Sequence, residues 1–459
     1  MGHRFHPTIL REYDIRGIVG QTLFAADAHA IGRVFAAFEL AEGGRRIAVG
    51  YDGRLTSPEL ETALVDGLTE GGADVVRIGR GPTPMLYFAA ATLEVAGGIM
   101  VTGSHNPPDH NGFKMVLGGK AFFGDAIQKL GKAAAEFGAP GRPRGSVTEQ
   151  SLFDVYVERL ARDYDGKRPL TVAWDCGNGA TGEVVTALTR NLPGRHFLLN
   201  ETIDGTFPAH HPDPTVPENL VQLQEAVREN RCDLGIGFDG DGDRIGVVDA
   251  QGRIFWGDQL MIVLARDVLA SRPGSPILAD VKASQVLFDE IARAGGKPVM
   301  METGHSLIKA RLAKTGAPLA GEMSGHIFFA DRYYGFDDAI YVAVRLLGIL
   351  GRADESLAAM RDKLPAVVNT PELRLECDDT RKFAIVEEVR ERLRRSGAEM
   401  TEIDGVRVNT PDGWWLLRAS NTQAVLVVRA ESSSPEGLER LRQRVTAELA
   451  PSGLSLPAE

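Results

Sequence analysis

Residues 237–244 read Gly237-Phe238-Asp239-Gly240-Asp241-Gly242-Asp243-Arg244, with three carboxylates at alternate positions among glycines. Glycine lets the backbone turn tightly enough for the three aspartates to converge. Clustered carboxylates repel one another unless a proton or a cation relieves them. Mg²⁺ prefers such oxygen ligands and completes its shell with water or a substrate phosphate. The stretch therefore predicts a divalent metal loop (residues 239–244), with a solvated acidic loop as the plain alternative.

The spacing of the aspartates matches only the beginning of an EF-hand calcium loop. Asp239, Asp241 and Asp243 would stand at positions 1, 3 and 5 of that loop. Position 6 is then Arg244 where glycine is required, and position 12 is Ala250 where a bidentate glutamate is required. The EF-hand is excluded, and a three-carboxylate site with room for another ligand remains.

A second motif lies upstream, where the apolar run Gly97–Val101 is followed by Thr102-Gly103-Ser104-His105-Asn106-Pro107. Gly103 allows an unusual backbone angle and Pro107 prevents immediate regular structure, so we expect a loop at a strand end. Ser104 in this serine loop (residues 102–107) is a candidate phosphoryl carrier. The segment is neither a Gly-x-Ser-x-Gly nucleophile elbow nor a nucleotide-binding P-loop. An ordinary polar turn is the alternative.

Two further segments carry groups that suit a phosphorylated sugar. The sugar loop (residues 321–326) contains Glu322, Ser324 and His326, which can hydrogen-bond to hydroxyls that both donate and accept. The phosphate loop (residues 418–422) lies between two strand-like runs and reads Arg418-Ala419-Ser420-Asn421-Thr422. A cation, two hydroxyls, an amide and turn N–H groups suit a phosphate. Each segment alone is also compatible with a polar turn.

Together these motifs resemble the α-D-phosphohexomutase family, in the expected order and over essentially the whole chain. Among its members, the bacterial bifunctional phosphomannomutase/phosphoglucomutases are most similar, mainly because of Met323 and residues 303–309. Smaller segments that agree are residues 11–17, 210–214, 280–282 and 303–306. One departure is Gln423-Ala424, where many relatives carry Glu-Pro. It leaves the phosphate-contacting positions before it intact.

The resemblance implies an α/β fold of three similar α/β domains with mixed sheets around a central cleft. It also implies a smaller C-terminal α+β domain of the TATA-box-binding-protein type. We place the domains at residues 1–149, 150–252, 253–365 and 366–459, with polar or Pro/Gly-rich breaks near residues 138–145, 251–252 and 364–371. A faint repeat supports three similar domains, because apolar runs at residues 47–53, 170–177 and 277–283 each end in aspartate plus small or polar residues. Residues 365–371 are a candidate hinge.

Local patterns agree with this organisation. Strand-like runs at residues 47–50, 75–78 and 97–101 alternate with an amphipathic segment at residues 58–68, which is typical of α/β wiring. In the last domain we expect helices at residues 380–395 and 435–449. Short strands are expected at residues 406–408, 415–418 and 425–429.

The resemblance also implies the reaction, which is reversible phosphoryl transfer between C1 and C6 of glucose or mannose phosphate. A phosphoserine and glucose 1,6-bisphosphate would be the intermediates, and Mg²⁺ the cofactor. The implied metal ligands are Asp239, Asp241, Asp243 and phosphorylated Ser104. The implied catalytic residues are Ser104, Lys114, Arg244, His305 and His326. The implied substrate-binding residues are Tyr13, Arg16, Lys282, Glu322, Ser324, Arg418, Ser420, Asn421 and Thr422.

Three alternatives remain open at this point. Phosphoglucosamine mutase is the nearest, although its members usually carry glutamine at the position of Met323. A serine-dependent sugar phosphatase would use the same Ser104 and metal but release phosphate to water. A non-catalytic sugar-phosphate binding protein is disfavoured, since Ser104 and the three aspartates are all present.

The amino-acid composition restricts the classes of partner and the cellular compartment that we expect for this protein. The 459-residue chain has a net charge of −11, which argues against nucleic acid or an acidic membrane surface as partner. Cys176, Cys232 and Cys377 are widely spaced and form no zinc pattern, so reduced thiols are expected. The N-terminus has no apolar signal core and no run is long enough to span a bilayer. We therefore expect a cytoplasmic protein with no obligate protein partner.

Overall fold

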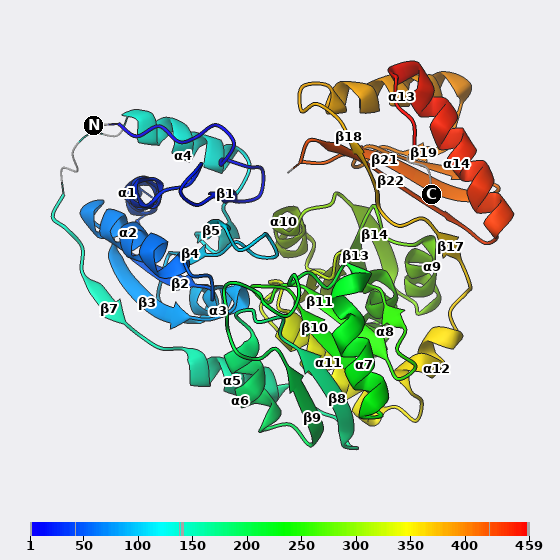
Figure 1. Ribbon diagram of the computed structural model, residues 1–459, viewed down its shortest axis with the longest axis horizontal. Helices are drawn as coiled ribbons and strands as arrows, with labels where there is room; N and C mark the ends of the chain where they lie inside the picture. The colour runs from blue at the N-terminus through cyan, green and yellow to red at the C-terminus, as the bar shows by residue number, and fades with distance from the viewer. Residues whose placement is uncertain (1, 42, 137, 139–141, 422, 457–459) are drawn as a thin grey trace.

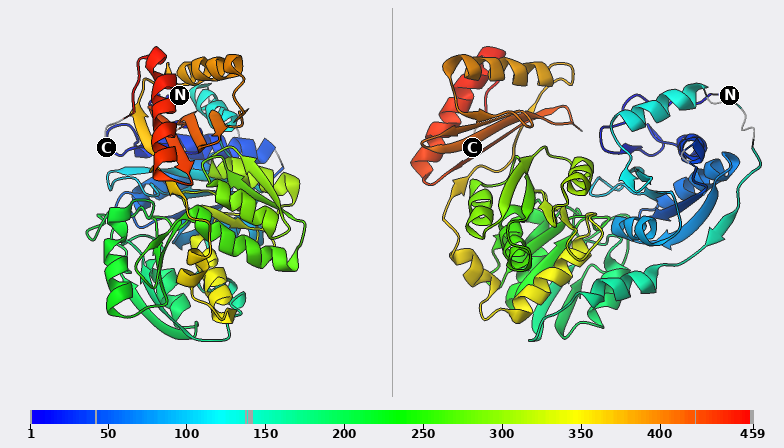
Figure 2. Two further views of the ribbon diagram at one scale, coloured as in Figure 1. Left: turned by 90° about the vertical axis from the view of Figure 1, so that its right-hand side faces the viewer. Right: turned by 180° about the vertical axis from the view of Figure 1, so that it is seen from behind.

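The computed structural model describes residues 2–41, 43–136, 138, 142–421 and 423–456. Within them the strands form four separate sheets, one after another along the chain. The first and the C-terminal units lie on opposite sides above the two middle units (Figure 1). The views from the side and from behind agree with this arrangement (Figure 2).

The first unit is a mixed sheet with strand order β1-β5-β4-β2-β3-β7, and β6 pairs with β5. Its strands are β1 (Ile15–Ile18), β2 (Arg46–Tyr51), β3 (Asp74–Arg80), β4 (Gly97–Val101), β5 (His110–Leu117), β6 (Lys120–Ala121) and β7 (Val147–Glu149). Its helices are α1 (Ala25–Ala41), α2 (Ser57–Glu70), α3 (Thr83–Thr92) and α4 (Asp125–Glu136). Side chains alternate across β2. Ile47 and Val49 therefore join the core under α1 and α2, while Ala48 joins the core that includes α3.

The second unit has strand order β12-β11-β10-β8-β9. Its strands are β8 (Leu170–Asp175), β9 (Gly194–Leu199), β10 (Leu234–Phe238), β11 (Ile245–Asp249) and β12 (Ile254–Phe255). Its helices are α5 (Phe153–Arg162), α6 (Gly182–Thr189), the 3₁₀ turn η1 (Pro217–Leu220) and α7 (Val221–Glu229). The predicted break at residues 251–252 is the turn between β11 and β12, so this sheet continues to Phe255.

The third unit has strand order β14-β13-β15-β16. Its strands are β13 (Pro276–Asp280), β14 (Lys297–Met301), β15 (Leu319–Gly321) and β16 (Ile327–Phe329). Its helices are α8 (Gly257–Ser271), α9 (Gln285–Arg293), α10 (His305–Thr315), α11 (Ala339–Arg352) and α12 (Leu357–Asp362). Helices α8 and α11 are the most deeply buried of these, and they belong to a core shared with the second unit and with α3.

The three units repeat one topology. Strands β2, β8 and β13 each pair in parallel with two neighbours, and one neighbour continues into an antiparallel strand. The orders β5-β4-β2-β3, β11-β10-β8-β9 and β16-β15-β13-β14 therefore correspond. The apolar runs of the predicted repeat are these central strands, so the prediction of three similar domains is confirmed. The antiparallel connection holds the serine loop in the first unit, the metal loop in the second and the sugar loop in the third.

The C-terminal unit is an antiparallel sheet with order β17-β22-β21-β20-β19, and β18 also pairs with β22. Its strands are β17 (Val368–Asn369), β18 (Leu373–Glu376), β19 (Met400–Thr401), β20 (Val406–Thr410), β21 (Gly413–Ala419) and β22 (Val425–Ser432). Its helices are α13 (Lys382–Ser396), α14 (Pro435–Leu449) and the 3₁₀ turn η2 (Ala450–Ser452). Ser434 caps α14 by accepting from Gly437 N at 3.1 Å, and Pro435 suits the first helical position. The predicted α+β unit is confirmed.

Two sequence-based expectations concern the chain as a whole. Cys176, Cys232 and Cys377 are all free, and the first two are buried. Among the helices of the described residues, none is long and apolar enough to cross a membrane.

Asp338 at the start of α11 gives the fold a pH-dependent stability. The carboxylate accepts from Tyr341 N at 2.9 Å and from the hydroxyls of Tyr156 and Tyr333 at 2.8 Å. Burial raises the pKa of Asp338 to about 6. The folded state then binds more protons than the unfolded state between about pH 4 and pH 6, so the unfolding free energy falls as pH rises through that window, by about 3 kcal/mol.

We therefore expect the unfolding free energy of Asp338→Asn to depend less on pH between about pH 4 and pH 6, because the amide does not titrate. Urea unfolding of both proteins from pH 4.5 to 7, in steps, measures it. Identical slopes for the two proteins would show that another group titrates there.

Candidate functional site

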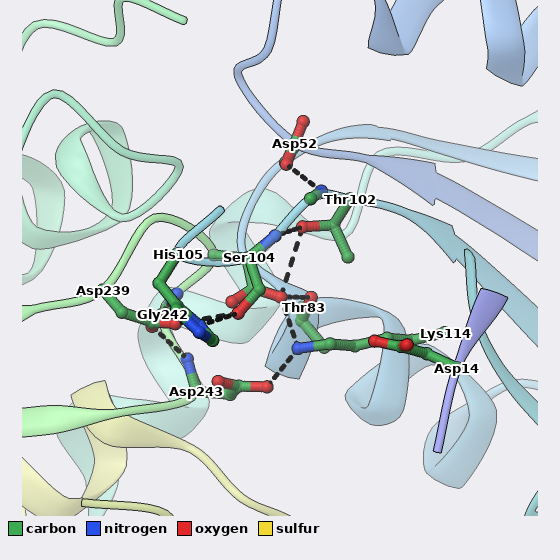
Figure 3. Close-up of polar contacts among 12 residues, drawn as sticks. Asp14, Asp52, Thr83, Thr102, Ser104, His105, Lys114, Asp239, Gly242 and Asp243 are labelled. Carbon is green, nitrogen blue, oxygen red and sulfur yellow. Dashed lines mark hydrogen bonds and ion pairs between the residues drawn. The ribbon is translucent and has the colours of Figure 1, made fainter. Parts of the chain in front are cut away.

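The serine loop connects β4 to β5 and brings Ser104 against the metal loop of the next unit (Figure 3). Ser104 has φ +50°, in the left-handed region that non-glycine residues rarely adopt. Its amide donates to Thr102 Oγ1 at 2.9 Å, and its Oγ lies 3.1 Å from Asp239 Oδ2. Asp52 at the end of β2 accepts from Gly103 N at 3.2 Å. The hydroxyl is thus buried at a junction between two units.

The metal loop is the tight connection between β10 and β11, and its three carboxylates are fully buried. Asp239 Oδ1 accepts from the amides of Gly242, Asp243 and Arg244 at 3.0–3.1 Å, which closes the turn. Gly242 has φ +78°, so glycine relieves the backbone there. Ligand atoms of Asp239, Asp241 and Asp243 lie within 4.8 Å of one another. The predicted convergence of the aspartates is confirmed.

Lys114 on β5 meets this cluster from the first unit. Its Nζ donates to Asp241 Oδ2 at 2.7 Å and also to Asp243 Oδ2. Thr83 Oγ1 donates to the same Asp241 oxygen at 2.5 Å. The opposite oxygens, Oδ1 of Asp241 and Oδ1 of Asp243, are buried without a hydrogen-bond partner. Two orphaned carboxylate oxygens beside Asp239 are the donor set of a hard divalent cation, so these residues fit Mg²⁺.

The ionisation of the cluster follows from burial and crowding. Burial raises the pKa of Asp239 well above its ordinary value, and the neighbouring Asp241 and Asp243 raise it further. For Lys114, burial acts to lower the pKa, but Asp241 and Asp243 outweigh it and hold the pKa above its ordinary value. The ammonium therefore stays charged, and a proton or a second cation is needed to relieve Asp239.

A second buried network joins the metal loop to the third unit. Arg244 Nε donates to His326 Nε2 at 2.9 Å. Because that nitrogen accepts, the ring proton belongs on His326 Nδ1, which lies 3.1 Å from Asp337 Oδ2. Lys309 Nζ donates to Asp337 Oδ1 at 2.9 Å. His305 stacks on His326 with ring centroids 5.3 Å apart.

Burial, reinforced by Lys309, lowers the pKa of His305 well below its ordinary value. His305 is therefore neutral at pH 7. Both predicted histidines lie beside Asp337, and His326 also lies 3.6 Å from Asp243 Oδ1.

We expect Asp337→Asn to lower kcat by about 10- to 100-fold with little change in KM. The amide replaces an acceptor that orients His326 and, through it, Arg244. Steady-state kinetics with a sugar 1-phosphate would measure this, and Asp338→Asn is the matched control. That control removes the neighbouring buried carboxylate, which accepts from the first turn of α11 and from two tyrosine hydroxyls. Equal kcat in both variants would contradict the orienting role.

The sugar loop is the turn between β15 and β16. Glu322 is buried, and its Oε1 accepts from Gly304 N at 2.7 Å. Asp280 at the end of β13 accepts from Met323 N at 3.2 Å, as Asp52 does from Gly103 in the first unit. Ser324 is half-buried in the same loop. The strand-terminal aspartates of two repeats thus hold the functional loops beside them.

The phosphate loop contacts the first and third units through Tyr13. Asn421 Nδ2 donates to Tyr13 Oη at 2.7 Å, and Tyr13 Oη donates to Thr303 O at 2.9 Å. Arg418 Nε donates to Asp404 Oδ2 at 2.9 Å, and that oxygen also accepts from Thr303 N at 3.1 Å. Ser420 Oγ accepts from Gln423 N at 3.2 Å. The predicted Thr422 lies outside the described residues.

Two further predicted residues border these loops. Arg16 Nη1 donates to Asn106 Oδ1 of the serine loop at 2.5 Å. Lys282 Nζ donates to Glu372 Oε2 at 3.1 Å, across the junction between the third and C-terminal units. Every predicted site residue that the structure describes therefore lies in one of four loops or in contact with residues beside them.

Several site residues were missed from sequence. Thr83, Arg54, Asp337, Lys309 and Asp404 each contact a predicted residue or loop. His105 was also passed over, although its Nδ1 lies 3.1 Å from Ser104 Oγ. The Asp-x-Arg that follows the first repeated strand was a usable signal for Arg54. The others carry no local pattern, because their partners are distant in sequence.

Comparison with known proteins gives the family. The models of phosphoglucomutase/phosphomannomutase alpha/beta/alpha domains I, II and III match residues 7–137, 154–252 and 256–368. The model of the phosphoglucomutase/phosphomannomutase C-terminal domain matches residues 372–448. Together the four models cover most of the chain.

Proteins that are similar over the whole chain point to the same family as the domain models. The phosphomannomutase/phosphoglucomutase of Pseudomonas aeruginosa is 44% identical over 450 residues, which is 98% of this chain and 97% of that protein. The phosphoglucomutase of Neisseria gonorrhoeae is 43% identical over 442 residues, 96% of each chain. A crystal structure of a phosphoglucomutase/phosphomannomutase family protein from Burkholderia thailandensis superposes with a TM-score of 0.93 at 44% identity, covering 99% of this chain and 100% of that one. Site geometry, four domain models and whole-chain relatives together show that the chain belongs to the phosphoglucomutase/phosphomannomutase family.

Proposed function

We propose that the protein interconverts hexose 1-phosphates and 6-phosphates, with Ser104 as the phosphoryl carrier and a hexose 1,6-bisphosphate as the intermediate. The observation that carries this is the 3.1 Å contact between Ser104 Oγ and Asp239 Oδ2. Phosphoryl transfer requires a positioned nucleophile and a cation that neutralises the transferring group, and this contact places the hydroxyl beside three carboxylates that can hold such a cation. The domain division at residues 149, 252 and 365 stays part of this proposal.

The charged groups have distinct roles in this proposal. Asp239, Asp241 and Asp243 would hold Mg²⁺ together with an oxygen of phosphorylated Ser104. Bound Mg²⁺ would supply charge neutralisation at the transferring phosphoryl group. Lys114 contacts Asp241 and Asp243, and Arg244 is the last residue of the metal loop. Both side chains are cationic and can donate charge-assisted hydrogen bonds to the transferring group.

Each half-reaction moves one phosphoryl group and one proton. In the first, the free hydroxyl of the sugar phosphate attacks phosphorus and gives its proton to a base, while the bond from phosphorus to Ser104 Oγ breaks and an acid returns a proton to Oγ. The raised pKa of Lys114 suits a cation or acid better than a base. His326 Nε2 carries the ring lone pair and now accepts from Arg244. His326 is our preferred base, taking the proton when Arg244 donates to the phosphoryl group instead, and His305 is the alternative.

The remaining loops would bind the substrate. Arg418, Ser420, Asn421 and Thr422 would take the phosphate that is not transferred, with Tyr13, Arg16 and Lys282 beside it. Glu322 and Ser324 would bind the 3- and 4-hydroxyls. Glucose and mannose present these two hydroxyls alike, so a site that ignores the 2-position accepts both sugars. We place the reaction in the cytoplasm, which the free thiols of Cys176, Cys232 and Cys377 support.

Intact mass and peptide mapping test the proposal. Protein purified with Mg²⁺ is treated with glucose 1,6-bisphosphate and then with excess glucose 1-phosphate. We expect one phosphate on Ser104, its discharge by the sugar phosphate and the appearance of glucose 6-phosphate. Phosphate release to water without bisphosphate dependence would instead indicate a phosphatase, and an unmodified Ser104 would remove the carrier role.

Rates of turnover of glucose, mannose and glucosamine 1-phosphates test the sugar specificity of the protein. Comparable rates on glucose and mannose support dual specificity. A rate on glucosamine 1-phosphate well above both would assign the protein to phosphoglucosamine turnover instead.

A further inference from the structure

Arg54, which follows the central strand of the first unit, lies beneath the serine loop. Its side chain is 1% exposed. Nη2 donates to Ser104 O at 2.7 Å and to Asn106 O at 2.5 Å. Nη1 donates to Pro107 O at 2.5 Å and to His110 O at 2.9 Å. One guanidinium therefore gathers four backbone carbonyls of the loop and of the strand that follows it.

The packing around Arg54 is equally specific. A Cβ on Gly103 would lie 2.5 Å from Arg54 Nε and 2.6 Å from Cζ, so only glycine fits against the guanidinium. The Phe207 ring of the second unit lies 5.0 Å from Cζ. Asp52 Oδ2 lies 3.4 Å from Arg54 Nε and accepts from Gly103 N. The charge is thus balanced, and the loop backbone is held from both sides.

The serine loop that Arg54 contacts has an unusual backbone conformation. Ser104 has φ +50°, which persists only where the surroundings determine it. Four carbonyls that point to one centre repel one another unless a cation separates them. Without the Arg54 guanidinium the serine loop can relax to an ordinary backbone conformation. Ser104 Oγ then turns away from Asp239.

Comparison among the repeats points to the same role. The residue two positions after the strand-terminal aspartate is Arg54 in the first unit, Gly177 in the second and Lys282 in the third. Lys282 extends its ammonium to Glu372 in the C-terminal unit. The carbonyl-gathering arginine thus occurs in the repeat that carries the serine loop.

We propose that Arg54 is the positioning residue of the phosphoryl carrier, holding the serine loop in the strained conformation that aims Ser104 Oγ at the metal loop. This inference rests on the proposed function of Ser104. Arginine suits the role because its planar fork presents five N–H donors in fixed directions. Lysine offers three donors on one nitrogen and cannot reach the four carbonyls together.

The test uses Arg54→Lys, with Arg77→Lys as the matched control. Arg77 lies on β3 of the same sheet, and its guanidinium pairs with Glu61 at 2.8–2.9 Å. In Arg54→Lys we expect kcat to fall by about 100-fold, since small displacements of a reacting group have effects of that size. The KM for glucose 1-phosphate should change by less than about three-fold, because the phosphate loop is untouched. Single-turnover transfer of phosphate from glucose 1,6-bisphosphate to Ser104 should slow in parallel.

A folded Arg54→Lys with kcat within about two-fold of the wild type would overturn the proposal. If that variant does not fold, Gly103→Ala serves, since it keeps Arg54 and pushes the loop away from it. Wild-type kcat in Gly103→Ala would equally overturn the proposal. Failure of the proposed function is distinguishable, because then wild-type Ser104 itself takes no phosphate from the bisphosphate.

Discussion

Replacing Ser104 by alanine is expected to lower kcat by about 10⁴-fold or more, because it removes the oxygen that carries the phosphoryl group. Oγ is the atom that faces Asp239, and the loop around it is held by bonds to backbone atoms. The variant should therefore fold normally. Steady-state kinetics and peptide mapping after treatment with glucose 1,6-bisphosphate measure the loss of turnover and of the phosphoserine.

Ser151→Ala is the control for this substitution, since Ser151 is exposed and precedes α5. It should keep full activity and full phosphorylation. Substantial turnover by Ser104→Ala, with phosphate recovered on another residue, would move the carrier role elsewhere.

Replacing Asp241 by asparagine is expected to remove most of the stabilisation by Mg²⁺ and to lower kcat by about 10²- to 10³-fold. Without metal the effect on stability should be small. The weakened contact with Lys114 costs about 1.5–3 kcal/mol. Relief of repulsion with Asp239 and Asp243 offsets this loss. With Mg²⁺ at about 100 times its Kd, the wild type should gain about 2.7 kcal/mol.

Urea unfolding with and without Mg²⁺ measures the gain in unfolding free energy from Mg²⁺ in the wild type and in Asp241→Asn. Asp331→Asn is the control variant. Asp331 pairs with the buried Arg345 at 2.8 Å, outside the metal loop. Its loss should destabilise the protein equally in both conditions and leave the Mg²⁺ increment intact. A full Mg²⁺ increment in Asp241→Asn would place the cation somewhere other than the metal loop.

Much of the fold could be predicted because the relevant patterns are local. The run at residues 47–53 begins with consecutive apolar and small residues, as in a strand buried on both faces, and β2 spans Arg46–Tyr51 with four consecutive buried residues. The amphipathic segment at residues 58–68 begins with proline, and α2 spans Ser57–Glu70. The turn at residues 251–252, where we divide the second and third domains, is followed by one more strand of the second sheet, because a glycine turn serves a hairpin as well as a linker.

The residues of the candidate site also fall into two groups: those with a local sequence pattern and those whose contacts are distant in sequence. Asp239, Asp241 and Asp243 could be predicted to converge because they share one short glycine-rich turn. Asp337 could not be assigned, because its function depends on His326 and Lys309, which reach it from separate elements. The Asp-x-Arg run marks Arg54 locally, but the groups that its guanidinium binds are carbonyls 50 to 56 residues away, which the sequence does not reveal.

Local sequence is enough to show which chemical groups are available: a loop serine, three converging carboxylates, a polyol-binding turn and a cationic phosphate loop, each within a few residues of chain. It is also enough to show the repeated strand that builds three units, since an apolar run that ends in aspartate is a local pattern. The contact of Ser104 with Asp239 and the neutralisation of Asp241 by Lys114 become visible only in the folded chain, because they join residues 135 and 127 positions apart. Such contacts depend on how separately folded sheets pack against one another, and burial at that junction is what gives their charges their strength.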